Sequence, residues 1–154
     1  MNNNIIQFLQ QQTCASICCV DEQDKPYCFS CFYAFNFEEG LLYFKSSANA
    51  HHSALMKINP VIAGTVLPDK LSKLNVKGIQ FEGIVLDVNH PMVKDALGNY
   101  LKQHPLALAV PGEVWVIQIS HIKMTDSTLG FGKKISWNRS ERAGEKLSGE
   151  LNLI

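Results

Sequence analysis

The chain has 154 residues, 46% of them hydrophobic, and its 14 Lys and Arg residues balance 14 Asp and Glu residues. This length suits one domain, and this hydrophobic fraction is too high for a disordered chain. A net charge of zero gives no basic field for nucleic acid or an anionic membrane surface, so neither is expected as a partner. The start at Met1–Ile6 lacks the features of a signal peptide, and no apolar run reaches the roughly 20 residues of a membrane span. A cytoplasmic protein is therefore predicted.

The N-terminal third predicts a helix followed by an antiparallel meander. The helix covers 4–12, where Ile5, Phe8 and Leu9 fall on one stripe. Three apolar segments separated by hairpin-length turns are predicted as strands, over 13–20, 26–35 and 41–44.

All five cysteines fall in this region, at positions 14, 18, 19, 28 and 31. An odd count without a signal peptide argues against a disulfide framework. Cys28 and Cys31 have CxxC spacing, but residues three apart on a strand point to opposite faces and do not converge on one metal ion. The cysteines are therefore interpreted as small, buried hydrophobic residues, while CxxC redox chemistry is the less favoured alternative.

The rest of the chain predicts two helices and three further strands. One helix covers 48–59, capped by Ser47 or Asn49 and with Leu55 and Ile58 facing inward. A second helix begins at Pro91. The predicted strands cover 61–67, 79–88 and 113–124.

The last of these strands alternates, with Trp115, Ile117, Ile119 and His121 on one face. Six strands with short helices and no βαβ alternation predict an α+β fold built on an antiparallel β-barrel. The barrel domain is expected over residues 1–139, with a polar C-terminal tail at 140–154.

One segment has the composition of an anion site. A strand runs out through Lys45, Ser46 and Ser47 into a helix N-terminus that carries His51 and His52. Unpaired backbone N–H groups and the positive end of the helix dipole favour an anion there, and Lys, Ser and His side chains add charge and donors. A terminal-phosphate pocket is predicted. A capped surface helix with solvated Ser and His side chains is the open alternative.

The order of several short motifs resembles a known family. Gly40 begins a strand with Tyr43–Phe44. A turn at Ser46–Ser47 follows, then His51–His52 at the place of the family's basic pair, and then Asn59–Pro60. A later strand carries Gln80–Gly83, which matches the Glu-Gly pair that the family often has there, and an aromatic and basic segment follows at Phe131–Arg139. Together these features resemble the pyridoxamine 5′-phosphate oxidase-like family of FMN-binding split β-barrels, in particular its short bacterial branch.

The resemblance implies FMN as cofactor and a homodimer with flavin sites between its subunits. Lys45, Ser46, Ser47, His51 and His52 would surround the FMN phosphate and ribityl chain. In addition, Gln80 would approach the polar edge of the isoalloxazine ring, Trp137 would lie against the ring from the partner subunit, and Lys133 and Lys134 would add positive charge. Two alternatives stay open, in which Gln80 is a surface residue and Trp137 packs the C-terminal segment onto its own barrel.

The function expected from this resemblance is that of an FMN-binding redox protein whose substrate or electron donor is unknown. No catalytic side chain is assigned, because the flavin carries the electron chemistry. Basic residues that would grip a substrate phosphate are largely missing from Lys77–Gly83, which argues against pyridoxamine phosphate oxidation. The alternative is a non-enzymatic haem or flavin carrier, with His51, His52 or His121 as axial ligand. A barrel without cofactor that serves as a dimeric interaction unit is a third reading.

Overall fold

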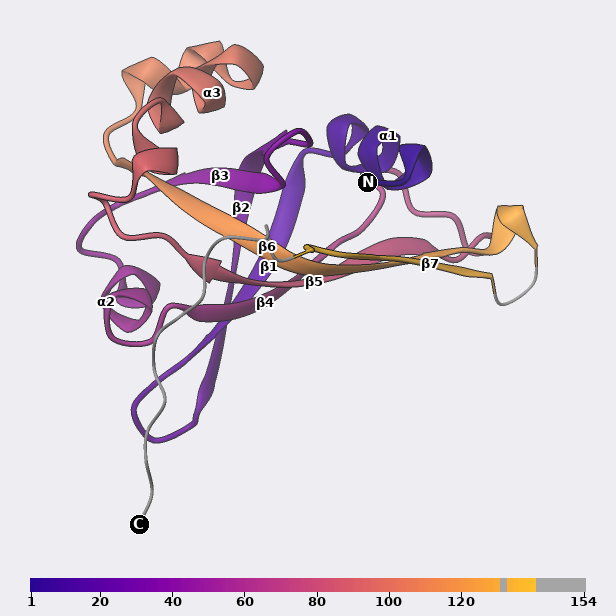
Figure 1. The fold of residues 1–154 in the computed structure, drawn as a ribbon, viewed down its shortest axis with the longest axis horizontal. Coiled ribbons are helices and arrows are strands. Elements are labelled where there is room, and N and C mark those ends of the chain that lie inside the picture. Colours follow the sequence, from indigo (N-terminus) through magenta and orange to yellow (C-terminus); the bar gives the residue numbers. More distant parts are fainter. Residues whose placement is uncertain (131–132, 141–154) are drawn as a thin grey trace.

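A computed structural model describes residues 1–130 and 133–140, and its main feature is one antiparallel sheet that closes into a barrel (Figure 1). The seven strands follow the order β3-β2-β1-β4-β5-β6-β7, and β3 also pairs with β6. This pairing closes strands β1 to β6 into the barrel and leaves β7 outside it. The predicted α+β fold with a six-stranded antiparallel barrel is confirmed.

The strands are β1 (Cys14–Val20), β2 (Pro26–Asn36), β3 (Leu41–Ser46), β4 (Val61–Val66), β5 (Lys77–Val85), β6 (Glu113–Asp126) and β7 (Lys134–Asn138). The α-helices are α1 (Asn3–Gln11), α2 (His51–Ile58) and α3 (Ala96–Gln103). Short 3-10 helices are η1 (Pro91–Val93), η2 (Pro105–Ala109) and η3 (Ser127–Leu129). Within the described residues, no helix is long and apolar enough to cross a membrane.

Two groups of buried side chains hold the fold together. The larger fills the barrel and includes the predicted stripe of α1, Ile5, Phe8 and Leu9, all at most 2% exposed. The smaller lies between the outer face of β3 and α3, where Tyr43 and Tyr100 are buried. Strand alternation explains this division, because successive residues of β3 point to opposite faces.

The helix predicted over 48–59 begins later than expected. It starts at His51, so its buried face consists of Ser53, Leu55 and Met56, and Ile58 is 60% exposed. The expected inward orientation of Ile58 is therefore wrong. The helix predicted from Pro91 is divided into η1 and α3.

A bulge in β6 changes which residues face the barrel interior. Glu82 pairs with His121 and Gly83 with Ile119, so Ser120 is left without a partner on β5. Beyond the bulge the buried residues are Ile122 and Met124 instead of the odd-numbered set. The expectation that His121 shares a face with Ile119 is wrong for this reason.

Strand β7 was not predicted. It pairs antiparallel with β6 through residues 121–125 and 134–138. Residues 131–132, and all of the predicted tail except Ser140, lie outside the described residues.

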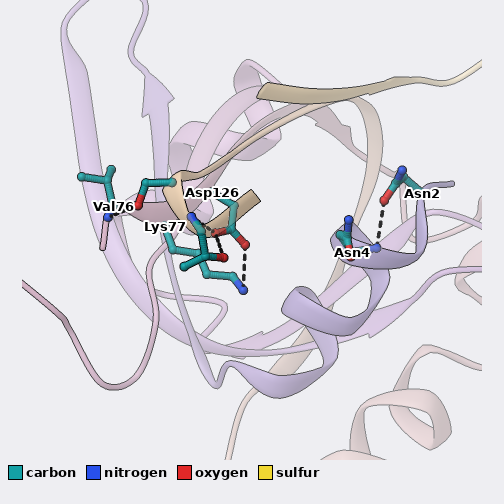
Figure 2. A network of polar contacts seen from close by, with 7 residues as sticks. Asn2, Asn4, Val76, Lys77 and Asp126 are labelled. Carbon is teal, nitrogen blue, oxygen red and sulfur yellow. Dashed lines mark hydrogen bonds and ion pairs between the residues drawn. The ribbon is translucent and has the colours of Figure 1, made fainter. Parts of the chain in front are cut away.

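A polar network joins the first residue of β5 to the last residue of β6 (Figure 2). Lys77 and Asp126 form an ion pair of 2.9 Å, and Asp126 is only 3% exposed. The Asp126 carboxylate also accepts hydrogen bonds from the Thr128 backbone N–H at 3.0 Å and the Thr128 hydroxyl at 2.6 Å. Burial acts to raise the pKa of Asp126, but the hydrogen bonds from Thr128 and the ion pair with Lys77 outweigh it and lower the pKa below its ordinary value. Asp126 is therefore expected to stabilise the fold as a carboxylate.

Cys18 and Cys28 form a disulfide, which contradicts the expectation that the cysteines are unpaired. The two residues lie directly opposite each other on β1 and β2, with Cα atoms 4.3 Å apart. The register of the β1–β2 hairpin therefore brings Cys18 and Cys28 together, and the CxxC spacing of Cys28 and Cys31 has no part in this disulfide. Cys14, Cys19 and Cys31 are free thiols, and of these only Cys19 is buried as expected.

The thiols should differ in reactivity. Burial, followed by the nearby Cys14, raises the pKa of Cys31 to about 12, and burial raises the pKa of Cys19. We expect iodoacetamide to label Cys14 first in the native protein, because only thiolates react and Cys14 is exposed. Mass spectrometry should find three labels after denaturation without reductant and five after reduction. Five labels before reduction would contradict the Cys18–Cys28 disulfide.

Gly64 on β4 is required by the packing inside the barrel. An added methyl group would overlap the Phe81 ring and lie 2.8 Å from the Ser16 carbonyl oxygen. Gly64→Ala is therefore expected to lower the free energy of unfolding by about 1–3 kcal/mol. Gly98→Ala in α3 is the matched control, since nothing lies within 4 Å of the added methyl group. It should stabilise the protein by about 0.5–1 kcal/mol. Urea unfolding measures both, and equal effects would contradict the packing argument.

Candidate functional site

The predicted anion segment lies where β3 ends and α2 begins. Ser46 is the last residue of β3, and its hydroxyl lies 2.6 Å from Nε2 of His52 in the first turn of α2. Either atom can be the donor, depending on the tautomer of the imidazole. A hydrogen bond between Ser46 and His52 therefore links the end of β3 to the start of α2.

The His52 ring rests on an aromatic platform. It is stacked on Phe29 of β2, with ring centroids 3.7 Å apart and an interplanar angle of 10°. Burial, with a smaller contribution from His51, lowers the pKa of His52 below its ordinary value. At neutral pH the imidazole is therefore mainly neutral, and it has one nitrogen left for a further hydrogen bond.

His51 lies beside this pair and is exposed. Its ring meets Tyr27 edge to face, with centroids 4.8 Å apart at 86°. Within the described residues, its ring nitrogens have no hydrogen-bond partner. His51 therefore has two nitrogens available to a ligand at the start of α2.

The turn before α2 is held without a side-chain cap on the helix. The fully buried Ser53 donates a hydrogen bond of 2.7 Å to the Ser47 carbonyl oxygen, and the Ser47 hydroxyl accepts from the Asn49 N–H at 3.2 Å. The N-cap is Ala50, which offers no side-chain oxygen, so the prediction of Ser47 or Asn49 as cap is wrong. The first-turn N–H groups of α2 thus lack the side-chain acceptor that most helices provide.

Lys45 points away from this group. Its ammonium donates to the carbonyl oxygens of Ala107, at 2.7 Å, and Val110. Neighbouring residues of a strand point to opposite faces, so Lys45 lies on the α3 side of β3 and Ser46 on the other. Two of the three ammonium protons are thereby used to hold the segment around η2.

The other predicted site residues lie on other strands. Gln80 is exposed on the outer face of β5, between Thr65 of β4 and Lys123 of β6. Lys133 is exposed just before β7, and so is Lys134, the first residue of that strand. The structure therefore brings together Ser46, Ser47, His51 and His52, and it does not bring Gln80 or Lys133 to them within one chain.

Trp137 is partly buried and packs against the hydrophobic core of its own barrel. A methyl group on Gly40 would lie 3.1 Å from its ring, so the tight turn before β3 fits against it. The neighbouring Arg139 donates to the carbonyl oxygens of Glu39 at 2.7 Å and Gly40 at 2.8 Å. This arrangement matches the open alternative in which Trp137 packs the C-terminal segment. Its approach to a flavin of a second subunit stays a prediction.

Tyr27 and Phe29 were not singled out from the sequence, although they form the aromatic side of the site. The available signal was alternation along β2, which puts them on the same face as the buried Tyr33. The sequence does not show where α2 packs, and this packing brings His51 against Tyr27 and His52 against Phe29.

No family model matches the chain. Its sequence is 36% identical over 135 residues to a UPF0306 protein of Photorhabdus laumondii, a match that covers 88% of this chain and 94% of the relative. The chain belongs to the UPF0306 family. A second family member, from Yersinia enterocolitica, is 34% identical over 137 residues and matches 89% of this chain and 92% of its own length.

Solved structures share the fold at low sequence identity. A heme binding protein from Mycobacterium smegmatis superposes with a TM-score of 0.71 at 13% identity, covering 85% of this chain and 55% of that protein. An FAD-binding protein from Mesorhizobium loti has a TM-score of 0.62 at 15% identity, with coverages of 82% and 95%. At these identities the likeness shows that this UPF0306 chain has their barrel fold.

Proposed function

We propose that the protein binds FMN, with the phosphate at the start of α2, and acts as a flavin-dependent redox protein. The observation that carries this proposal is the uncapped first turn of α2 next to the Ser46–His52 pair. A phosphate supplies the acceptor that these N–H groups lack, and the helix dipole favours its negative charge. The FAD-binding protein with the same fold supports a flavin as the ligand class.

Each residue has a distinct part in this assignment. The first-turn N–H groups, the Ser47 hydroxyl and the His51 and His52 imidazoles hold the phosphate, while Phe29 fixes the His52 ring by stacking. Lys45 acts indirectly, because its ammonium already bonds the Ala107 and Val110 carbonyl oxygens. The bound flavin would supply the electron transfer, and the chain supplies its orientation and access.

A homodimer is part of the proposal. The outer sheet face exposes the paired apolar side chains of Val61 on β4, at 59%, and Ile84 on β5, at 42%. Exposed apolar patches of this kind often mark association surfaces. Gln80 lies on the same face, so it would meet a flavin held by the second subunit. Light scattering should give the mass of a dimer, and a monomer would count against the roles of Gln80 and Trp137.

Haem is the second candidate ligand. It is supported by the heme binding protein with the same fold and by the His51 ring, whose nitrogens are free of hydrogen bonds within the described residues. An imidazole nitrogen of this kind can serve as an axial ligand.

The visible spectrum of freshly purified protein separates the two candidates. A flavin band, with FMN identified after release, is the expected result. A Soret band would instead identify haem as the bound ligand and would contradict the FMN assignment. Colourless protein that also fails to bind added FMN and added haem would overturn both assignments.

A further inference from the structure

We propose a second binding site, for a hydrophobic carboxylate, in the cleft between α2 and α3. The cleft has a volume of about 950 Å³, and its floor is the end of β5 and the beginning of β6. Figure 1 shows α2 and α3 at the same end of the barrel as the beginning of β6. This volume is in the range of about 300–1,000 Å³ that is typical of small-molecule pockets.

The walls are apolar on both sides. Met56 and Pro60 contribute from the side of α2, and Val93 and Leu97 from the side of α3. None of the residues assigned to the FMN phosphate lines this cleft. Helix α2 thus separates the two sites, with the histidines at its start and the cleft at its end.

Trp115 lines the cleft and carries a hydrogen-bond donor that no described residue uses. Its indole Nε1 is buried and has no hydrogen-bond partner within the described residues. A buried donor without a partner destabilises the protein, because it has lost its hydrogen bonds to water and gained none in return. A ligand oxygen that reached this N–H would remove that cost.

The cleft is lined by two lysines, Lys57 and Lys94, and by two acidic residues, Asp87 and Glu113, and the position beside Trp115 is taken by a lysine. Lys57 Nζ lies 5.9 Å from the centre of the Trp115 ring, and Lys57 and Lys94 form no ion pair with any described residue. Of the two acidic groups in the lining, Asp87 already accepts two hydrogen bonds from Asn89, and Glu113 is exposed at the first position of β6. An apolar body between the walls with its carboxylate near Lys57 and Trp115 satisfies these groups together.

The test uses anilinonaphthalene sulfonate, an aromatic anion, as the fluorescent probe and decanoate as the competing carboxylate. The full chain should bind the probe saturably at one site, and decanoate should displace it. Lys57→Gln should weaken the binding of both by about fivefold or more, the loss expected for one charge-assisted contact. Lys102→Gln is the matched control, because Lys102 lies on α3 outside the cleft and its ammonium donates to Asn99. Its affinity should stay within about twofold of wild type.

Amide NMR shifts on adding decanoate give an independent location. The expected shifts centre on the ends of α2, β5 and the start of β6, and FMN should not compete with decanoate. Three results would each overturn the proposal: no saturable binding by the wild-type protein, equal weakening by the two lysine variants, or shifts centred on the outer face of β1, β2 and β4.

Discussion

His52→Ala is expected to lower the affinity for FMN by about tenfold to a hundredfold while leaving riboflavin binding within about twofold of wild type. A hydrogen bond to a charged group contributes about 1.5–3 kcal/mol, which corresponds to this range. Riboflavin lacks the phosphate. If the phosphate is the only part of the flavin that His52 contacts, losing the imidazole should not change riboflavin affinity. The ratio of the two affinities, measured by flavin fluorescence, separates a phosphate contact from a general loss of structure.

His121→Ala is the control for this experiment. His121 lies on β6 opposite Asn138 of β7, away from the start of α2. FMN affinity should stay near that of wild type in this variant. If His52→Ala bound FMN as tightly as wild type, or lost FMN and riboflavin affinity in parallel, the phosphate assignment would be wrong.

Asp126→Ala should lower the free energy of unfolding by about 2–3 kcal/mol at pH 7, measured by urea unfolding. The change removes the partner of Lys77 and both hydrogen bonds from Thr128. Lys77 is 37% exposed, so water partly solvates its ammonium and the loss stays below that of a fully buried pair. Asp126→Asn keeps an acceptor for Thr128 and should cost less. Glu82→Gln, on the exposed face of β5, is the control and should change stability by less than about 0.5 kcal/mol.

The Asp126 contribution should depend on pH in a defined direction. The folded state has the lower pKa, so the unfolded state binds more protons as the solution becomes acidic. The stabilisation is full above the ordinary carboxyl pKa of about 4 and is lost as the pH falls through the lower pKa of the folded state. The wild type should therefore lose more stability than Asp126→Asn between neutral and acidic pH. Parallel pH profiles would contradict this role for the ion pair.

The fold could be predicted because β1, β2 and β3 are apolar segments separated by short turns, and because apolar and polar residues alternate along β6. The stripe of Ile5, Phe8 and Leu9 was equally clear, and it closes one side of the core. The β6 bulge at Ser120 was not predictable from alternation, because a single extra residue reverses the faces that follow it. Strand β7 has only five residues, but polar and apolar residues alternate along it, with Ile135 and Trp137 on one face, so alternation could have predicted it.

The candidate site was predicted in part. Adjacency in the sequence correctly placed Ser46, Ser47 and the two histidines together, because a strand that runs directly into a helix leaves little freedom. Strand alternation alone could have placed Lys45 on the opposite face from Ser46. Pairing counted outward from the β1–β2 turn could likewise have set Cys18 opposite Cys28. Contacts between elements distant in the chain, such as Phe29 with His52 and Lys57 with Trp115, needed the structure.

The central claim, a phosphate-binding start of α2 in a flavin-binding protein, is tested most directly by titrating the wild-type protein with FMN and riboflavin under the same conditions. FMN is expected to bind at least about tenfold more tightly, since several donors would contact its phosphate. Equal affinities for FMN and riboflavin, or no binding of either, would contradict the account.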